Sequence, residues 1–181
     1  MKAVMLAAGI GNRLSKDRPE PPKVLLRFAG KTLLERHLEH LKRCGASELV
    51  VGVGYEAEMV HAEIRRLGAE DFVRTVHNPR FRDGSGITLA SLGDEFACGR
   101  DVLLMDGDVL YDPSILADVA RLPRGFAIDP RTDPGDEEMM VGVKSEICHN
   151  IFRSASSLRA FENFLRGMQQ RAQTIHAEAS S

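Results

Sequence analysis

The chain has 181 residues, a length typical of one domain, and its 43% hydrophobic and 28% charged residues are ordinary for a globular protein. This composition excludes a disordered tail, a collagen-like fibre and a coiled-coil rod. The net charge of -2 shows no overall basic excess of the kind that favours nucleic acid or an anionic membrane, so we expect neither as a partner.

The cysteines and the N-terminus indicate a cytoplasmic protein. Cys44, Cys98 and Cys148 stand far apart with no CxxC pair, which disfavours a disulfide framework and a zinc ribbon and favours reduced thiols. The apolar run at the N-terminus breaks at Gly9 and is too short to span a bilayer, so we expect it to form a buried first strand. No later stretch is apolar enough to be transmembrane.

Short apolar runs rich in β-formers alternate with helical patterns along the chain. The expected strands are Ala3–Leu6, Leu49–Val53, Phe72–Val76, Val102–Met105, Gly125–Ile128 and Met140–Val143. The expected helices are Leu33–Arg43, Ala57–Leu67, Ile87–Glu95 and Pro113–Arg121. This alternation predicts an α/β domain with a mostly parallel sheet, in which ligands bind beyond the carboxyl ends of the strands.

The first expected helix has recognisable start and stop signals. Thr32 with Glu35 forms a capping box, and Gly45 stands where the helix should end. Its apolar stripe consists of Leu34, His37, Leu38 and Leu41. We interpret His37 and His40, which are three residues apart, as helix-surface or edge-packing residues rather than metal ligands.

The C-terminal third of the chain changes character twice. Residues 129–138 are acidic and rich in turn formers, which predicts a solvated loop between two strands. We divide the chain into a domain at 1–144 and a tail at 145–181 with one amphipathic helix. The apolar stripe of that helix consists of Leu158, Phe161, Leu165 and Met168. Such a stripe packs either on its own domain or against a partner helix, which leaves a homodimer open.

A glycine loop follows the first strand directly, in the run Leu6–Arg13. Small residues there let backbone N–H groups approach an anion closely. The dinucleotide-binding fingerprint is excluded because Leu14 replaces its third glycine and the prolines from Pro19 onward prevent an early helix. A P-loop is excluded because Leu25 occupies its first glycine position, so we interpret Gly30–Thr32 as a turn and helix cap.

Basic residues follow the glycine loop, and two acids follow the fourth expected strand. The basic residues are Arg13, Lys16, Arg18, Lys23 and Arg27, against Asp17 and Glu20. Cations beside such a loop suit a triphosphate, although a plain surface loop has the same composition. Asp106 and Asp108 end an apolar strand on the ligand side of the sheet, where carboxylates suit Mg²⁺; the alternative is an Asx turn.

These segments together resemble the sugar-nucleotide and alcohol-phosphate nucleotidyltransferases. LAAGIGNRL followed by PPKVLLRFAGKTLLERHLEHL is similar to that family's glycine loop, its PK pair and its first helix. MDGDVLY resembles the family's metal-binding segment, and the resemblance covers about residues 1–144. Asn78-Pro79 followed by Gly84-Ser85-Gly86 resembles the small cytidylyltransferases that act on phosphocholine, inositol phosphate or aminoalkylphosphonates. The resemblance implies a Rossmann-like three-layer sandwich with a C-terminal helix.

The resemblance also implies a role for individual residues. The nucleotide-binding residues would be Leu6, Ala7, Ala8, Gly9, Gly11, Asn78, Ser85, Gly86, Thr88 and Asp106. Arg13 and Lys23 would be catalytic, on the β/γ- and α-phosphates, and Asp108 would hold Mg²⁺ with support from Asp106. Tyr55 and Lys144 are candidates for the acceptor pocket, with an ordinary strand–helix turn and an exposed strand end as the alternatives.

The implied reaction is an in-line displacement. A phosphate or phosphonate oxygen of a small molecule attacks the α-phosphorus of a nucleoside triphosphate, with CTP favoured and UTP open, and pyrophosphate leaves. The nucleophile is already anionic, so positioning and charge neutralisation suffice. Residues 145–181 are shorter than the family's C-terminal part and contain no aspartate. The alternative is therefore a nucleotide-binding regulatory or interaction subunit without turnover.

Overall fold

The computed structural model describes residues 1–10, 20–97, 99–122, 125, 127, 140–144 and 147–152. The chain divides into two compact units, Met1–Gly125 and Phe126–Ser181, which we call the N-terminal and the C-terminal unit. Among the described residues, no helix is both long and apolar enough to cross a membrane.

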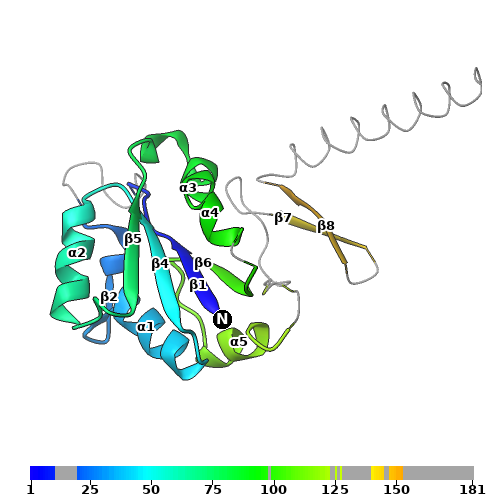
Figure 1. Cartoon of the computed structure of the whole chain (residues 1–181), viewed down its shortest axis with the longest axis horizontal. Helices are drawn as coiled ribbons and strands as arrows, with labels where there is room; N and C mark the ends of the chain where they lie inside the picture. Colours follow the sequence, from blue (N-terminus) through cyan, green and yellow to red (C-terminus); the bar gives the residue numbers. More distant parts are fainter. Residues whose placement is uncertain are drawn as a thin grey trace, which may run out of the picture. The chain divides into compact units, whose positions relative to one another are not determined.

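A parallel sheet of four strands forms the centre of the N-terminal unit (Figure 1). The strands are β1 (Lys2–Leu6), β4 (Glu48–Val53), β5 (Val73–His77) and β6 (Val102–Asp106), in the order β5-β4-β1-β6. Their register pairs Leu6 with Gly52 on one side and with Asp106 on the other. The α/β fold and the first four expected strands are therefore confirmed, and the carboxyl ends of these strands share one edge.

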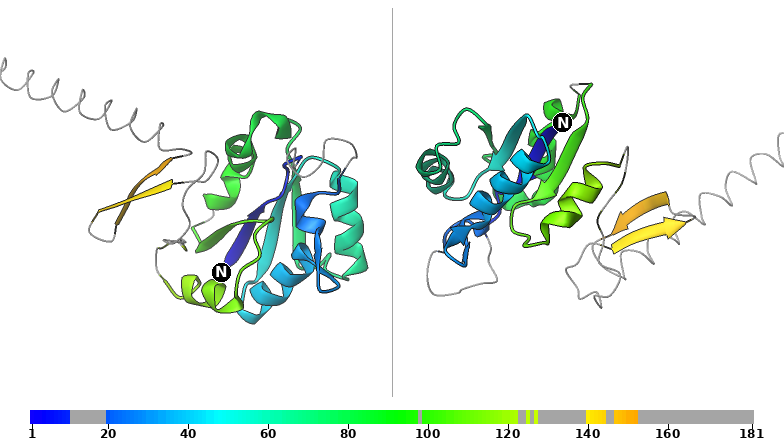
Figure 2. Two further views of the ribbon diagram at one scale, coloured as in Figure 1. Left: turned by 180° about the vertical axis from the view of Figure 1, so that it is seen from behind. Right: turned by 90° about the horizontal axis from the view of Figure 1, so that it is seen from below.

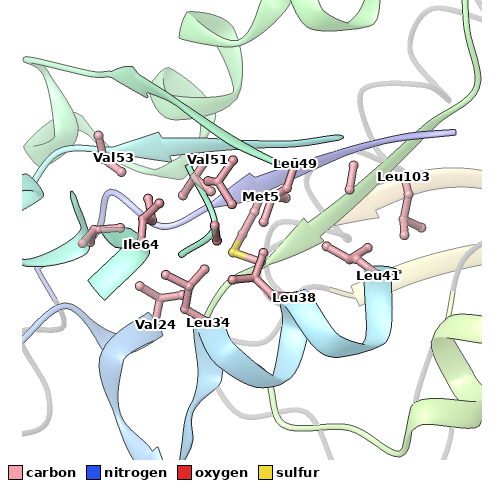
Figure 3. Packing of buried hydrophobic residues seen from close by; sticks show 14 of the residues in the cluster. Met5, Val24, Leu34, Leu38, Leu41, Leu49, Val51, Val53, Ile64 and Leu103 are labelled. Atoms are coloured by element: carbon pink, nitrogen blue, oxygen red, sulfur yellow. The ribbon is translucent and has the colours of Figure 1, made fainter. Parts of the chain in front are cut away.

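Helices cover both faces of the sheet (Figure 2), because its residues alternate between two apolar cores. The larger core lies under α1 (Leu33–Arg43), α2 (Ala57–Arg66) and α5 (Pro113–Val119), and Figure 3 shows part of its packing. The smaller core joins Val4 and Val50 to Leu92, which lies between α3 (Ser85–Ser91) and α4 (Gly93–Phe96). The result is a three-layer sandwich.

The start and the end of α1 follow its sequence signals. The Thr32 hydroxyl accepts a hydrogen bond from the Glu35 backbone N–H at 3.1 Å, and Gly45 follows the helix with φ at +74°. The Glu35 carboxylate pairs with Arg66 at 2.9 Å. Before α1, the short strands β2 (Arg27–Phe28) and β3 (Lys31–Thr32) form a hairpin. Its turn, Ala29-Gly30, has positive φ at both residues, which confirms the interpretation as a turn and cap.

Two expected elements differ from the structure. The helix expected at Ile87–Glu95 begins earlier, at Ser85, and is interrupted at Leu92. Leu92 is buried against the sheet, and a Cβ on Gly52 would lie only 2.9 Å from its Cδ1 atom. The close packing of Leu92 on Gly52 in the sheet therefore accompanies the break between α3 and α4. Of the strand expected at 125–128, the two described residues, Gly125 and Ala127, are not in a strand.

In the C-terminal unit, β7 (Met140–Lys144) and β8 (Ile147–Phe152) form an antiparallel pair. The strand expected at Met140–Val143 is thus confirmed as β7. The sequence interpretation has no counterpart of β8, because it assigns only a helix to the tail. The acidic loop at 129–138 and the stripe from Leu158 to Met168 lie outside the described residues. The described residues also form two single-turn helices, η1 (Lys23–Leu25) and η2 (Phe81–Asp83).

Candidate functional site

A cavity of about 240 Å³ lies at the carboxyl ends of β1 and β6. Four stretches of the N-terminal unit contribute to its walls: Leu6–Ile10, Lys23 with Val24, Phe81–Thr88 and Asp106–Asp108. This is the position at which parallel α/β sheets bind ligands, because the loops that leave neighbouring strands converge there.

Most of the residues singled out from the sequence meet at this cavity. Those that line it are Leu6, Ala7, Ala8, Gly9, Lys23, Ser85, Thr88, Asp106 and Asp108. Asn78, Gly86 and Tyr55 are not among its lining residues. Gly11 and Arg13 lie outside the described residues, and Lys144 ends β7 in the C-terminal unit.

The charged wall of the cavity consists of one lysine and two carboxylates. The Lys23 ammonium donates a hydrogen bond to the Asp108 carboxylate at 2.8 Å, and both side chains keep solvent access, with exposed fractions of 29% and 41%. Partial burial, followed by the negative charge of Asp108, raises the pKa of the Asp106 carboxyl, and Lys23 opposes that shift. The two carboxylates therefore repel each other and favour a cation between or beside them.

Gly107, between the two aspartates, is buried, and both its N–H and its carbonyl have partners. Its N–H donates to the Leu6 carbonyl at 2.9 Å, and its carbonyl lies 3.3 Å from His37 Nε2. A Cβ here would lie 3.1 Å from the Leu6 oxygen, so only glycine fits without a shift. His37 and His40 are 2% and 9% exposed, so of the two alternatives given for them, helix surface and edge packing, the surface one is wrong. His37 instead follows the buried stripe of α1 to which its helical spacing assigns it.

A second part of the cavity wall, contributed by η2, is aromatic and basic. Phe81 and Arg82 line the cavity, and the Arg82 guanidinium lies 5.4 Å from the centre of the Phe81 ring. A Cβ on Gly54 would lie 2.5 Å from the Phe81 Cβ atom, so the close approach of this ring requires glycine. The Tyr55 ring lies 6.4 Å from the Phe81 ring, and the Tyr55 N–H donates to the Ala8 carbonyl. Tyr55 therefore supports the wall rather than bordering the cavity.

Asn78 lies behind the residues that line the cavity and contacts one of them. Its side chain is only 2% exposed, and its amide nitrogen donates to the Thr88 hydroxyl at 3.0 Å. Its amide oxygen accepts from the Arg80 backbone N–H at 2.9 Å, which orients the chain that leads into η2. Asn78 thus fixes Thr88 and the loop before α3 and does not itself face the cavity.

Sequence reasoning missed Phe81, Arg82 and His37. The first two lie between the Asn-Pro pair and the glycine-serine loop, both of which were recognised, so an aromatic–basic pair within an assigned segment was an available signal. The helical spacing of His37 indicates its place in the apolar stripe, but no sequence signal indicates its contact with Gly107, which is 70 positions away in the chain.

The donor set fits Mg²⁺ when a phosphate is present. Within the described ranges no group of three or more histidine, cysteine or acidic side chains could hold a metal ion without further ligands. Mg²⁺ is commonly held by one or two carboxylates together with substrate phosphates, and Asp106 and Asp108 supply such a pair. A small-residue backbone loop, a lysine and two carboxylates around one cavity together suit a phosphorylated ligand.

Residues 3–177 match the model of the MobA-like NTP transferase domain. The CMP-5'-(3-aminopropyl)phosphonate synthase of Streptomyces rubellomurinus is 33% identical over 132 residues, which cover 71% of this chain and 20% of that protein. The choline-phosphate cytidylyltransferase of Streptococcus pneumoniae is 36% identical over 83 residues, which cover 46% of this chain and 34% of that protein.

Solved structures of similar proteins share the fold. The CTP:phosphocholine cytidylyltransferase of Streptococcus pneumoniae superimposes with a TM-score of 0.65 at 27% identity, over 84% of this chain and 64% of that one. The inositol-1-phosphate CTP transferase of T. maritima gives 0.63 at 27% identity, over 84% and 63%. The chain thus spans less than two thirds of the length of each of these relatives.

Proposed function

This chain belongs to the MobA-like NTP transferase domain family, and on that premise we propose that it transfers a nucleotidyl group to a small phosphorylated molecule. The donor is a nucleoside triphosphate, with CTP favoured, and the acceptor carries a phosphate or phosphonate. The names of the similar proteins support this choice, since they include a CMP-phosphonate synthase, a choline-phosphate cytidylyltransferase and an inositol-1-phosphate CTP transferase.

The observation that carries the proposal is the Lys23–Asp108 pair, which lines the cavity at the carboxyl ends of the strands. Each partner satisfies the other at 2.8 Å, yet both remain accessible. A triphosphate and Mg²⁺ present opposite charges to the same two side chains. Lys23 would pair with phosphate oxygen, and Asp108, beside Asp106, would hold Mg²⁺, whose charge would offset that of the triphosphate. Binding thereby replaces one ion pair by two charge-complementary contacts.

The other residues that line the cavity would contact different parts of the nucleotide. The Ala7–Gly9 loop lies where backbone N–H groups can approach the sugar and phosphates, because these residues have small side chains or none. Ser85 and Thr88 offer hydroxyls to the base on the other side, and Asn78 holds Thr88 in place. Arg13 is proposed to share the β- and γ-phosphates with Gly11, as the motif implies.

The chemistry needs few proton transfers. An anionic oxygen of the acceptor forms a bond to the α-phosphorus, the bond from the α-phosphorus to its bridging oxygen breaks, and pyrophosphate leaves with that oxygen. No proton has to be removed from the nucleophile. The chain's contribution is to hold the reactants in line and to neutralise charge at the α-phosphate through Lys23.

Pyrophosphate release tests the proposal. We would assay ATP, CTP, GTP and UTP, each with phosphocholine, inositol 1-phosphate and 2-aminoethylphosphonate, in the presence of Mg²⁺. Release should require both a donor and an acceptor and should be fastest with CTP. Lys31→Ala is the matched lysine control, since Lys31, in β3, pairs with Glu39 on α1 and does not line the cavity.

Three other results of these experiments would each change the proposal in a different way. Tight binding of CTP without release for any acceptor would favour the regulatory subunit. Fastest release with UTP would change the donor but keep the reaction. No binding of any nucleotide would contradict the assignment of the cavity.

A further inference from the structure

A buried histidine lies beneath the carboxylate wall and contacts its backbone. His37, on α1, is 2% exposed, and its Nε2 atom lies 3.3 Å from the Gly107 carbonyl. Its Nδ1 atom lies 3.1 Å from the Tyr111 hydroxyl, and the two rings are 5.4 Å apart. Because Gly107 separates Asp106 from Asp108, this contact reaches the segment that bears both carboxylates.

The partners of the imidazole determine its protonation. A carbonyl oxygen only accepts, so Nε2 carries the proton and donates it to Gly107, and Nδ1 accepts from the Tyr111 hydroxyl. Burial lowers the pKa of His37 to about 4, which leaves the ring neutral at neutral pH. Burial also raises the pKa of Tyr111 to about 12, which keeps its hydroxyl protonated and able to donate.

The Gly107 backbone is therefore held from two directions. Its N–H bonds to the Leu6 carbonyl at 2.9 Å and its C=O to His37, so a shift of this peptide breaks a hydrogen bond on one side or the other. Val24, next to Lys23, closes the third side, since its Cγ2 atom would lie 3.2 Å from a Cβ on Gly107. The helix that carries His37 is itself anchored, with Leu34 and Leu38 in the main core (Figure 3).

We propose that His37 is a positioning residue for Asp106 and Asp108: through Gly107 it fixes the two carboxylates in the orientation that receives the metal–triphosphate complex. The proposal rests on the function proposed above. The contact links the core to the backbone that carries two solvent-accessible carboxylates, of which Asp108 also bonds Lys23. Partners behind a ligating group typically change metal affinity or activity by about 10- to 100-fold when they are removed.

Three variants separate positioning from simple packing. His37→Leu places an apolar side chain in the same space and removes both hydrogen bonds. His37→Gln keeps an N–H near the Nε2 position. Tyr111→Phe removes only the hydrogen bond to Nδ1. His61→Leu is the matched control, since His61 lies on α2, bonds Thr75 at 3.1 Å and does not line the cavity.

The main measurement is Mn²⁺ binding in the presence of saturating CTP, followed by the electron paramagnetic resonance signal of free Mn²⁺. We expect His37→Leu to weaken this binding by about 10-fold or more and His37→Gln to restore it to within about three-fold of wild type. Tyr111→Phe should weaken it by about three-fold, the effect of one neutral hydrogen bond. CTP binding without metal and the His61→Leu protein should match wild type, and kcat should fall more than KM rises.

Several results would overturn the positioning role. One is a His37→Leu protein that melts earlier yet binds Mn²⁺–CTP like wild type, since that outcome describes a packing residue. If His37→Leu does not fold, the other two variants decide. Wild-type Mn²⁺ affinity in Tyr111→Phe, together with a ten-fold loss of Mn²⁺ affinity in His37→Gln, would also contradict the positioning role. A wild-type protein that neither binds Mn²⁺–CTP nor releases pyrophosphate would instead overturn the proposed function, and the role of His37 with it.

Discussion

Two lysine–carboxylate pairs lie at opposite ends of the parallel sheet and differ mainly in exposure. Lys2 pairs with Glu95 at the amino end and Lys23 with Asp108 at the carboxyl end, both at 2.8 Å. The first pair is 5% and 12% exposed, and the second 29% and 41%. Glu95 also accepts a hydrogen bond from Arg74 at 2.7 Å.

The difference shows which ion pair can take part in binding. A buried carboxylate with two basic partners has little room for a ligand, and the hydrogen bonds from Arg74 and Lys2 lower the pKa of Glu95. An accessible pair contributes little to stability and can exchange its partners for a charged ligand. We therefore assign the amino-end pair to the stability of the fold and propose that the carboxyl-end pair takes part in ligand binding.

The largest effect expected from this comparison is the loss of activity in Lys23→Ala. Removing one charge-stabilising group should lower kcat/KM by about 10²- to 10³-fold. The free energy of unfolding should change by less than about 1 kcal/mol, as for other accessible ion pairs. Pyrophosphate release and urea unfolding measure the two quantities. Activity close to wild type in a folded Lys23→Ala protein would remove this lysine from the mechanism.

The buried His37, near the carboxyl end of the sheet, is expected to make the free energy of unfolding depend on pH. The pKa of His37 is about 4 in the folded protein against an ordinary value of 6.5. Below 6.5 the unfolded chain binds a proton that folded His37 excludes, so stability decreases as pH falls from 6.5 to 4 and then levels off. At about 1.4 kcal/mol per pKa unit, this amounts to about 3 kcal/mol.

The comparison that isolates His37 is wild type against His37→Gln in urea unfolding at several pH values. His40 lowers the pKa of His37 and Asp108 raises it, and both remain in the variant. The wild-type curve should therefore show the additional loss between pH 6.5 and 4. Parallel curves for the two proteins would mean that His37 is not a buried neutral group.

At the amino end, Lys2→Met should affect stability and not activity. The variant keeps the buried aliphatic stem and leaves Glu95 with Arg74 as a partner, so we expect a loss of about 2 kcal/mol, less than for a fully unpaired buried charge. Pyrophosphate release should stay within about two-fold of wild type because this side chain does not touch the cavity. A ten-fold loss of activity at unchanged stability would reverse the assignment of the two ends.

The smaller of the two expected effects on activity is at the aromatic wall. Gly54→Ala places a Cβ 2.5 Å from the Phe81 Cβ atom, so the ring has to move. Overpacking of this kind costs about 1–3 kcal/mol, and we expect KM for CTP to rise by about 10-fold. Gly93→Ala is the control, since nothing lies within 4 Å of the added Cβ there. Equal KM values in the two variants would show that Phe81 does not shape the cavity.

Local signals predicted much of this molecule. The cap at Thr32 and the glycine at Gly45 placed α1 at Leu33–Arg43, the bounds that the structure shows. The apolar runs located β1, β4, β5 and β6, and the motif residues Lys23 and Asp108 do meet. These features depend on neighbouring residues or on the shared edge of parallel strands.

What the sequence did not predict depends on contacts between distant segments. The break at Leu92 results from its packing on the sheet, and the contact of His37 with Gly107 joins two segments that are 70 positions apart in the chain. Tyr55 supports Phe81 instead of facing the cavity because Gly54 admits the ring at that point. No periodicity or motif in the sequence reports such pairings.

Amide hydrogen exchange with and without CTP and Mg²⁺ tests the central claim most directly, namely that the cavity at the carboxyl end binds the nucleotide. Added nucleotide should slow exchange in Leu6–Ile10, Phe81–Thr88 and Asp106–Asp108, and should leave the residues around Lys2 and Glu95 unchanged. Slowed exchange confined to the groove formed by His61, Arg65 and Thr75, or none in the cavity residues, would contradict it.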